Sequence, residues 1–145
     1  MKIRITRLRE DIALPTYATN GSVAFDLAAA EQTTIPAKSV AFIPTGLIIA
    51  TPAGYALILT ARSSLMRKTG LCLANGVGTI DQDFCGPNDE IKLVTWNGTD
   101  KDVTVEKGDR LAQGLFMKID VAEWEEGLTE AISRGGLGST GGYTA

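Results

Sequence analysis

The chain has 145 residues, 44% hydrophobic and 21% charged, which predicts a single globular domain with a full hydrophobic core. A net charge of −3, no histidine and only two cysteines exclude a basic nucleic-acid surface, a Ser–His or Cys–His pair and a His- or Cys₄-zinc site. Cys72 and Cys85 are therefore expected to be buried or incidental thiols. The chain shows neither a secretory signal nor an apolar run of roughly 20 residues, so we expect a cytoplasmic protein.

Short segments of alternating or β-branched residues follow one another along the chain and predict strands. Turn sequences separate several of them, at "TPAG" (51–54), "NGTD" (97–100) and "EKGD" (106–109). So many short strands indicate an all-β fold of the sandwich, jelly-roll or barrel type. The predicted strands cover residues 2–7, 23–27, 39–45, 46–51, 55–61, 90–96, 102–105 and 110–119.

One short helix is predicted, at "SSLMRKTG" (63–70), with a serine capping its start and Gly70 closing its end. The overlapping segment "ARSSL" (61–65) follows a predicted strand and offers one arginine and two hydroxyl groups. An arginine grips phosphate through two parallel hydrogen bonds, so this segment could hold an anion. The alternative is that a serine only caps the helix and that Arg62 is an ordinary surface charge.

The segment "NGVGTIDQDFCG" (75–86) begins with a tight Asn-Gly turn. A strand over residues 79–84 would place Asp81 and Asp83 on one face and Ile80, Gln82 and Phe84 on the other. In a chain without histidine, a carboxylate is the strongest general base available near neutral pH. The alternative is a pair of solvent-facing aspartates on an edge strand.

After Asp120 the alternation ends in an acidic stretch, whose "EWEE" is typical of a solvated face, followed by the glycine-rich "SRGGLGSTGGYTA" (133–145). Residues 136–141 match the dinucleotide fingerprint G-x-G-x-x-G, but they lack the strand-to-helix context in which it works. The tail is either a frayed end or a lid that orders when an anion binds.

Five segments together resemble the five motifs of the trimeric deoxyuridine triphosphatases, the dUTPases, in their order and spacing. The resemblance implies a distorted jelly-roll or barrel-like subunit with one short helix, a homotrimer with three shared active sites, and hydrolysis of dUTP to dUMP and pyrophosphate with Mg²⁺ held by the triphosphate. It divides the chain into a core (1–120) and a C-terminal arm (121–145) that closes over the site. The segments are "VAFDL" (23–27), "ARSSL" (61–65), "NGVGTIDQDF" (75–84), "KGDRLAQGLF" (107–116) and "SRGGLGSTGG" (133–142).

The resemblance also implies a role for individual residues. Asp81 matches the aspartate that deprotonates the water attacking the α-phosphorus, and Asp26 matches an acid near the water shell of the metal. The residues that match phosphate contacts are Arg62, Ser63, Ser64 and Gln113. Those that match the uracil-reading hairpin are Asn75, Gly78, Thr79 and Ile80, with Lys92 adding a backbone contact from its far strand. Those that match the mobile arm are Arg134, Gly138, Ser139 and Thr140.

The chain departs from the family pattern at several positions. Phe84 stands where the family has a tyrosine against the deoxyribose, and its ring should still crowd out a ribose 2′-hydroxyl. Leu137 stands where an aromatic ring covers the uracil, and losing a stacking interaction of about 1–3 kcal/mol should weaken closure. The arm is a residue or two shorter before Leu137, and the turn "CGPNDE" (85–90) is longer than usual.

Two other functions fit parts of the pattern. A dCTP deaminase, or a bifunctional deaminase and diphosphatase, shares the fold and the "RSS" motif, but the deaminase uses a glutamate at the position of Asp81 and has a longer chain. A non-catalytic β-trimer that only binds nucleotide or a partner protein would have lost the base or a phosphate arginine. Asp81, Arg62 and Arg134 are all present, which favours dUTP hydrolysis.

Overall fold

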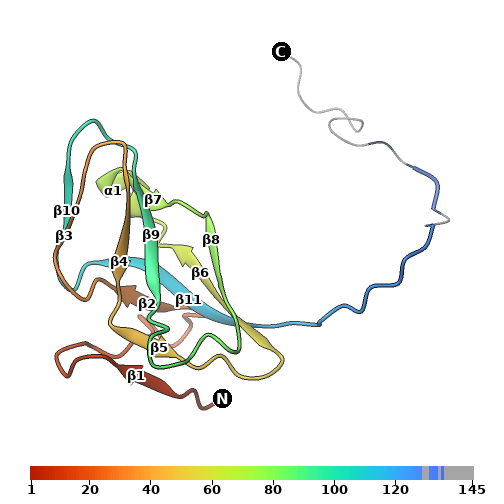
Figure 1. Ribbon diagram of the computed structural model, residues 1–145. Helices are drawn as coiled ribbons and strands as arrows, with labels where there is room; N and C mark the ends of the chain where they lie inside the picture. Colours follow the sequence, from red (N-terminus) through yellow and green to blue (C-terminus); the bar gives the residue numbers. More distant parts are fainter. Residues whose placement is uncertain (129–130, 134, 136–145) are drawn as a thin grey trace.

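The computed structural model describes residues 1–128, 131–133 and 135. These residues form eleven strands and one short helix (Figure 1), which confirms the predicted all-β class. The strands are β1 (Ile5–Arg7), β2 (Phe25–Ala28), β3 (Thr33–Ile35), β4 (Val40–Pro44), β5 (Leu47–Ile49), β6 (Tyr55–Ala61), β7 (Leu71–Leu73), β8 (Val77–Ile80), β9 (Lys92–Asn97), β10 (Val103–Val105) and β11 (Arg110–Lys118); the helix is α1 (Leu65–Thr69).

The strands form a four-stranded sheet in the order β2-β11-β6-β8, a three-stranded sheet in the order β4-β9-β7, and the two-stranded pairs β1-β5 and β10-β3. All of these pairings are antiparallel. Inward-facing side chains of the two larger sheets meet in one apolar core, because alternate residues of each strand point to the same face. The largest fully buried apolar side chains are Leu27, Ile35, Ile43, Ile49, Leu57, Leu71, Ile91, Leu93 and Leu111.

Each of the eight strands predicted from the alternating or β-branched segments has a counterpart in the structure, and β6 has the predicted bounds. The strand predicted over 79–84 is wrong after Ile80. There the chain turns instead, with the amide of Phe84 donating to the carbonyl of Asp81 at 3.4 Å. The segment resembles a strand in sequence, but Ile80 is the last residue of β8 to pair with β6. Asp81 and Asp83 therefore do not share the face of a strand.

Helix α1 lies where it was predicted and ends as predicted. Gly70 adopts a left-handed conformation with φ of 73°, and its amide donates to the carbonyl of Met66 at 2.9 Å. Any other residue would be strained at this φ, and a Cβ would lie 2.2 Å from Thr99. The predicted cap at the start is wrong in one respect. Ser64 occupies the N-cap position, but its side chain makes no capping hydrogen bond.

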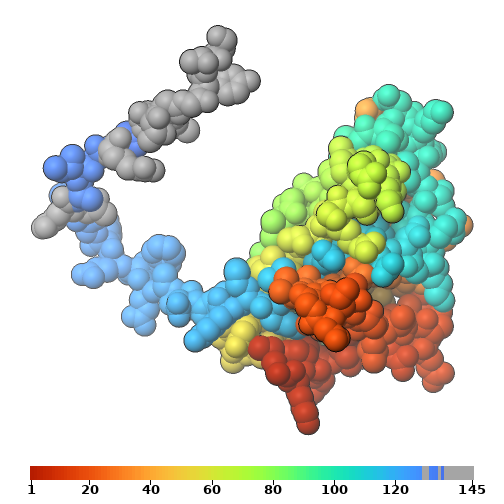
Figure 2. All heavy atoms as spheres, turned by 180° about the vertical axis from the view of Figure 1, so that it is seen from behind, coloured from red at the N-terminus to blue at the C-terminus, as the bar shows by residue number. Residues whose placement is uncertain are grey.

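After β11, residues 121–128 leave the body of the molecule and run away from it in both views (Figures 1 and 2). Trp124 and Leu128 are 94% and 99% exposed. All four residues of "EWEE" (123–126) are exposed in the single chain, whereas the division into a core and a closing arm stays a prediction. Among the described residues, no helix has the length and apolar character needed to cross a membrane.

Candidate functional site

Asp26, on β2, is a buried carboxylate that faces two guanidinium groups. Its side chain is only 5% exposed. Arg62 Nε lies 2.9 Å from its Oδ1, and Arg110 Nη1 lies 3.0 Å from its Oδ2. Gln113 Nε2 donates to Oδ1 at 3.4 Å. Both carboxylate oxygens therefore accept charged hydrogen bonds, which are the stronger class in proteins.

The strand register explains why these side chains meet. Gln113 pairs with Asp26 on one side and with Thr60 on the other, so β11 lies between β2 and β6. Arg62 follows β6 directly, and its amide donates to the carbonyl of Leu111 at 3.0 Å. The fold thus brings together three of the residues expected near the phosphates and the metal, from three segments far apart in the sequence.

A polar cavity of about 350 Å³ opens beside this cluster, between α1 and the turn that precedes β11. Three cationic side chains line it, Arg62, Lys68 and Arg110, against one acidic side chain, Asp109. Ser64 contributes a hydroxyl group to its wall, and the neighbouring Ser63 is exposed. An excess of cations with hydroxyl donors suits an anionic ligand such as a phosphate chain.

Sequence reasoning missed Arg110 and Lys68. Arg110 belongs to the quoted segment "KGDRLAQGLF", but only its proximity to Asp26 singles it out, and that proximity depends on strand pairing. Lys68 is one of two basic residues in the last turn of α1, where cations are common for reasons of helix stability alone.

Asp81 lies far from this cluster within one chain. Val77 pairs with Thr60 and Ile80 with Leu57, so Asp81 follows the opposite end of β8, three strand spacings away from Asp26. Ordinary strand spacing and rise place Ile80 about 17 Å from Asp26. Asp81 and Asp83 are exposed there, and so is Phe84. One copy of the chain does not bring the expected base and the expected phosphate residues together.

The expected uracil-reading hairpin is not a pair of bonded strands. β8 pairs with β6, whereas Lys92 opens β9 in the other sheet and pairs with Pro44. The predicted Asn-Gly turn is confirmed, since Gly76 has a φ of 69° and donates to the carbonyl of Leu73 at 3.0 Å. Asn75 and Thr79 are exposed, Gly78 is buried and Ile80 half-buried.

A wide loop, residues 81–91, therefore connects the two sheets. Its turn is closed by Asp89, whose Oδ2 accepts from the amide of Gly86 at 2.7 Å. Glu90 Oε1 accepts from the amide of Gly46, also at 2.7 Å, and ties the end of the loop to the body. Asp81 thus begins a loop that is fixed mainly at its far end.

The described residues contain no group of three His, Cys, Asp or Glu side chains that could hold a metal ion by themselves. Mg²⁺ in proteins is commonly held by one or two carboxylates together with substrate phosphates and waters. Asp26 is the carboxylate placed among the cations of the cluster, and both its oxygens already accept hydrogen bonds. The donor set fits a metal that arrives on a phosphate chain and meets Asp26 through water. Arg134, Leu137, Gly138, Ser139 and Thr140 lie outside the described residues.

Comparison with known proteins identifies the family. The dUTPase family model matches residues 10–141. The deoxyuridine 5′-triphosphate nucleotidohydrolase of Hydrogenobaculum sp. (strain Y04AAS1) is 40% identical over 146 residues, which cover 97% of this chain and 99% of that protein. The protein of the same name from Helicobacter pylori (strain P12) is 40% identical over 144 residues, which cover 97% of each chain.

Solved structures of similar proteins indicate the same family and fold. The crystal structure of dUTPase from Streptococcus mutans is 35% identical and has a TM-score of 0.78, covering 86% of this chain and all of that one. The dUTPase of Staphylococcus bacteriophage 80alpha, at 22% identity and a TM-score of 0.86 over 97% of this chain and 98% of that one, shares the fold. The jelly-roll-like architecture is thereby confirmed, and a deaminase is not favoured. The chain therefore belongs to the dUTPase family, the dUTP diphosphatases.

Proposed function

We propose that this chain hydrolyses dUTP to dUMP and pyrophosphate, with Asp81 as the base that activates the attacking water. The observation that carries the proposal is the cluster of Arg62, Arg110 and Gln113 around buried Asp26, next to a cavity with an excess of cations. Phosphoryl transfer needs little from a protein except positioning and charge stabilisation, and this cluster supplies both.

In the proposed reaction, the water oxygen forms a bond to the α-phosphorus while its proton passes to the carboxylate of Asp81. The bond from the α-phosphorus to the bridging oxygen breaks, and pyrophosphate leaves with that oxygen. Arg62, Ser63, Ser64 and Gln113 hold the phosphate chain and stabilise the charge that develops on it. When bound, Mg²⁺ neutralises part of the charge of the triphosphate, and Asp26 would hold its water shell.

Uracil and deoxyribose are assigned to the segment around β8. The backbone of residues 78–80 and Asn75 read the edge of the base, and Lys92 adds a backbone contact. Phe84 packs against the sugar, where its ring leaves no room for a 2′-hydroxyl. Arg134, Leu137, Gly138, Ser139 and Thr140 belong to the arm (121–145), which closes over the bound nucleotide.

The assembly we propose is a homotrimer in which the Asp26 cluster of one copy faces the Asp81 loop of another. Its support is the separation of about 17 Å between these two parts within one chain, which strand spacing implies. A water cannot contact Asp81 and the phosphate chain at once across that distance. Two copies can supply one half of the site each.

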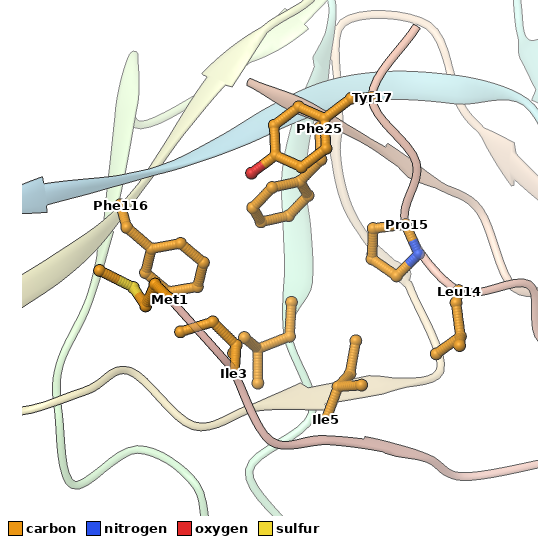
Figure 3. A pocket seen from close by; sticks show the side chains of 9 residues that line it. Met1, Ile3, Ile5, Leu14, Pro15, Tyr17, Phe25 and Phe116 are labelled. Atoms are coloured by element: carbon orange, nitrogen blue, oxygen red, sulfur yellow. The ribbon is translucent and has the colours of Figure 1, made fainter. Parts of the chain in front are cut away.

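Two apolar surfaces also support an assembly. A cavity of about 270 Å³ lies between the N-terminal strand and the four-stranded sheet (Figure 3). Val121, Trp124 and Leu128 on the arm are almost fully exposed. Exposed apolar side chains of this kind are what neighbouring copies cover in an oligomer. The cavity is lined by Met1, Ile3, Ile5, Leu14, Pro15, Tyr17, Phe25, Ile49 and Phe116.

The test is the substitution Asp81→Asn, assayed as pyrophosphate release from dUTP with Mg²⁺. We expect kcat to fall at least ~10²-fold, because a general base contributes 10²–10⁴-fold. Binding of dUpNHpp, the imido analogue of dUTP, should be retained, because an amide keeps the shape of the carboxyl group. Asp83→Asn, at an exposed acid two residues away, is the matched control and should stay active.

A nearly active Asp81→Asn enzyme would contradict the assignment of the base. The wild-type enzyme should be offered dCTP, dTTP and UTP in parallel, with ammonia measured as well. Turnover of dUTP alone supports the proposal, whereas ammonia released from dCTP would replace it with a deaminase.

A further inference from the structure

Three of the four asparagines in the chain are followed by glycine, at Asn20-Gly21, Asn75-Gly76 and Asn97-Gly98. An asparagine before glycine is prone to spontaneous deamidation, because glycine has no Cβ to shield its amide nitrogen or to restrict its backbone. In that reaction the glycine nitrogen attacks the side-chain carbonyl carbon of the asparagine. The three dipeptides are identical, so the fold decides how far their reactivities differ.

Asn20 and Gly21 form the exposed tip of a turn. The amide of Ser22 donates to the carbonyl of Thr19 at 3.1 Å, so the two residues occupy the central positions of the turn. Within the described part of the chain, neither the amide of Gly21 nor the side chain of Asn20 makes a hydrogen bond. A Cβ at Gly21 would meet nothing within 4 Å, so neighbouring groups leave room for the two to react.

Asn75 and Gly76 are exposed as well, but here the attacking nitrogen is already engaged. The amide of Gly76 donates to the carbonyl of Leu73 at 3.0 Å. This hydrogen bond must break before the nitrogen can turn toward the side chain of Asn75. One hydrogen bond corresponds to about 2- to 10-fold in an equilibrium constant, so the reaction at Asn75 should be slower by about that factor.

Asn97 is held at both reacting groups. It is fully buried, and its Nδ2 donates to three backbone carbonyls at 2.8, 3.0 and 3.2 Å. The amide of Gly98 donates to the carbonyl of Gly70 at 3.1 Å. The leaving group and the attacking nitrogen are therefore both fixed, and a reaction at Asn97 requires local unfolding.

We infer that Asn20 is a site of spontaneous covalent modification, and that the fold protects Asn75 partly and Asn97 fully. The nitrogen of Gly21 forms a bond to Cγ of Asn20, and the bond from Cγ to the side-chain nitrogen breaks. That nitrogen leaves as ammonia with the proton of the Gly21 amide. Water then opens the succinimide ring at either carbonyl, which gives aspartate or isoaspartate. The reaction needs no oxidant, and it makes the chain one unit more negative than its formal −3.

The consequence for activity differs between the exposed sites. The loop that carries Asn20 is held at its base, where the amide of Asp26 donates to the carbonyl of Thr16 at 3.1 Å. The extra backbone atom of isoaspartate lengthens only the turn, so dUTP hydrolysis should be retained. In the proposed function Asn75 reads the base, and a carboxylate there would lose a hydrogen-bond donor. This difference in activity rests on the proposed function, whereas the covalent chemistry does not.

The experiment incubates the folded protein at mildly alkaline pH and maps the products by peptide mass spectrometry. A protein isoaspartyl methyltransferase, which methylates isoaspartate, labels the same products independently. We expect product at Asn20 first, about 2- to 10-fold slower formation at Asn75, and none at Asn97. The matched control is the same protein unfolded in guanidinium chloride, where the three sites should react at similar rates because each is Asn followed by Gly.

Two variants test the site itself. Gly21→Ala keeps Asn20 but adds a methyl group beside the attacking nitrogen, so product at position 20 should be lost while Asn75 reacts as before. The variant should fold normally, because the added Cβ meets nothing within 4 Å. Asn20→Asp carries one of the two products from the start, and it should hydrolyse dUTP like wild type.

Each outcome decides one part of the inference. Product at Asn75 or Asn97 before Asn20 in the folded protein would overturn it, and so would the same order and spacing of rates in the unfolded chain. Hydrolysis of dUTP that declines in step with conversion of Asn20 would show that the turn belongs to the site. A wild-type protein that does not hydrolyse dUTP would refute the proposed function, but the mapped products would still decide whether Asn20 is the modified residue.

Discussion

The two halves of the proposed site are built in different ways. The phosphate half lies on paired strands, where Asp26 and Gln113 face each other across β2 and β11 and are backed by the buried ring of Phe25. The base half lies on the loop 81–91, where Asp81 is exposed just after the edge strand β8 ends. The phosphate half is held by the core of its own chain, whereas the loop of the base half is attached to the sheets only at its two ends.

The difference follows from what each half must do. Charge stabilisation is strongest when donors are fixed before the substrate arrives, because nothing then has to reorganise during the reaction. A base and a sugar-contacting ring must instead admit and release a nucleotide, and loops serve that purpose well. We therefore expect substitutions behind the phosphate half to lower stability and activity together, and substitutions in the loop to lower activity more than stability.

The largest expected effect is that of Gly114→Ala, behind the phosphate half. A Cβ at this position would lie 2.6 Å from two ring atoms of Phe25 and 3.2 Å from Leu57. The ring packs against Tyr17 and Phe116 with centroids 5.9 Å apart, so it has to shift against both rings to admit the new methyl group. Overpacking of this kind costs about 1–3 kcal/mol, to be measured as the free energy of unfolding in urea.

Gly21→Ala is the matched control, since a Cβ there meets nothing within 4 Å. It should be neutral or slightly stabilising. Gly114→Ala should also lower kcat/KM, because Gln113 and Asp26 are the neighbours of the residues that clash. Wild-type stability in Gly114→Ala, or full activity despite lost stability, would contradict the idea that the core holds this half in place.

The sequence predicts the strands of the phosphate half better than the loop of the base half. The reason lies in how far each predicted segment pairs with its neighbour. Residues 55–61 form a nearly continuous apolar run and residues 110–119 are rich in apolar residues, and the two segments pair with each other along most of their length, so pattern and structure agree. Residues 79–84 are predicted as a strand as well, but their pairing with β6 stops at Ile80↔Leu57 although β6 itself extends to Tyr55, and a residue pattern alone cannot show where pairing stops. The same limit hides β3 and β7, which are three residues each and depend on neighbours far along the chain.

The side-chain contacts within the site could not be predicted from the sequence either. Asp26, Arg62 and Gln113 were identified by resemblance, which carries known positions from one chain to another. Arg110 was not identified, because its contact with Asp26 depends on one extra residue in β11. A bulge has no reliable signature in the residues that form it. It becomes visible only when the register of two strands is known.

A smaller effect on stability is expected from Asp89→Ala, in the loop 81–91 of the base half. Asp89 Oδ2 accepts from the amide of Gly86 at 2.7 Å and closes the turn that follows Phe84. Its loss should lower the free energy of unfolding by about 0.5–1.5 kcal/mol at most, the value of one hydrogen bond. The activity should fall by a larger factor, because the loop that carries Asp81 and Phe84 is less well ordered.

The matched control is Asn88→Ala, at an exposed neighbour in the same turn. Denaturation in urea and steady-state kinetics with dUTP on the same preparations separate the two effects. If Asp89→Ala lowered stability and activity in parallel, as Gly114→Ala is expected to do, the two halves would not differ in the way proposed.

The smallest effect is expected from Lys107→Gln, at the rim of the phosphate half. Lys107 pairs with Asp11, which also pairs with Arg9 at 3.3 Å, and Arg9 in turn reaches Glu31 at 3.1 Å. The hydrogen bond from Lys107 is the main cause that lowers the pKa of Asp11 below its ordinary value. All of these groups are exposed, so salt and water screen them and the change in Tm at pH 7 should be small.

The sign and the pH dependence of this change in Tm are nevertheless definite. Because the pKa of Asp11 is lower in the folded chain, the pair stabilises the fold above the unfolded pKa and the contribution is lost as the pH falls through the folded value. The Tm difference between Lys107→Gln and wild type should therefore be present at pH 7 and vanish in strong acid, with Lys2→Gln as a control at an exposed lysine. Activity at pH 7 should not change, since paired strands and the core hold Asp26 and Arg110 in place. A marked loss of dUTP hydrolysis in Lys107→Gln would mean that surface ion pairs, and not the core, keep the phosphate half in position.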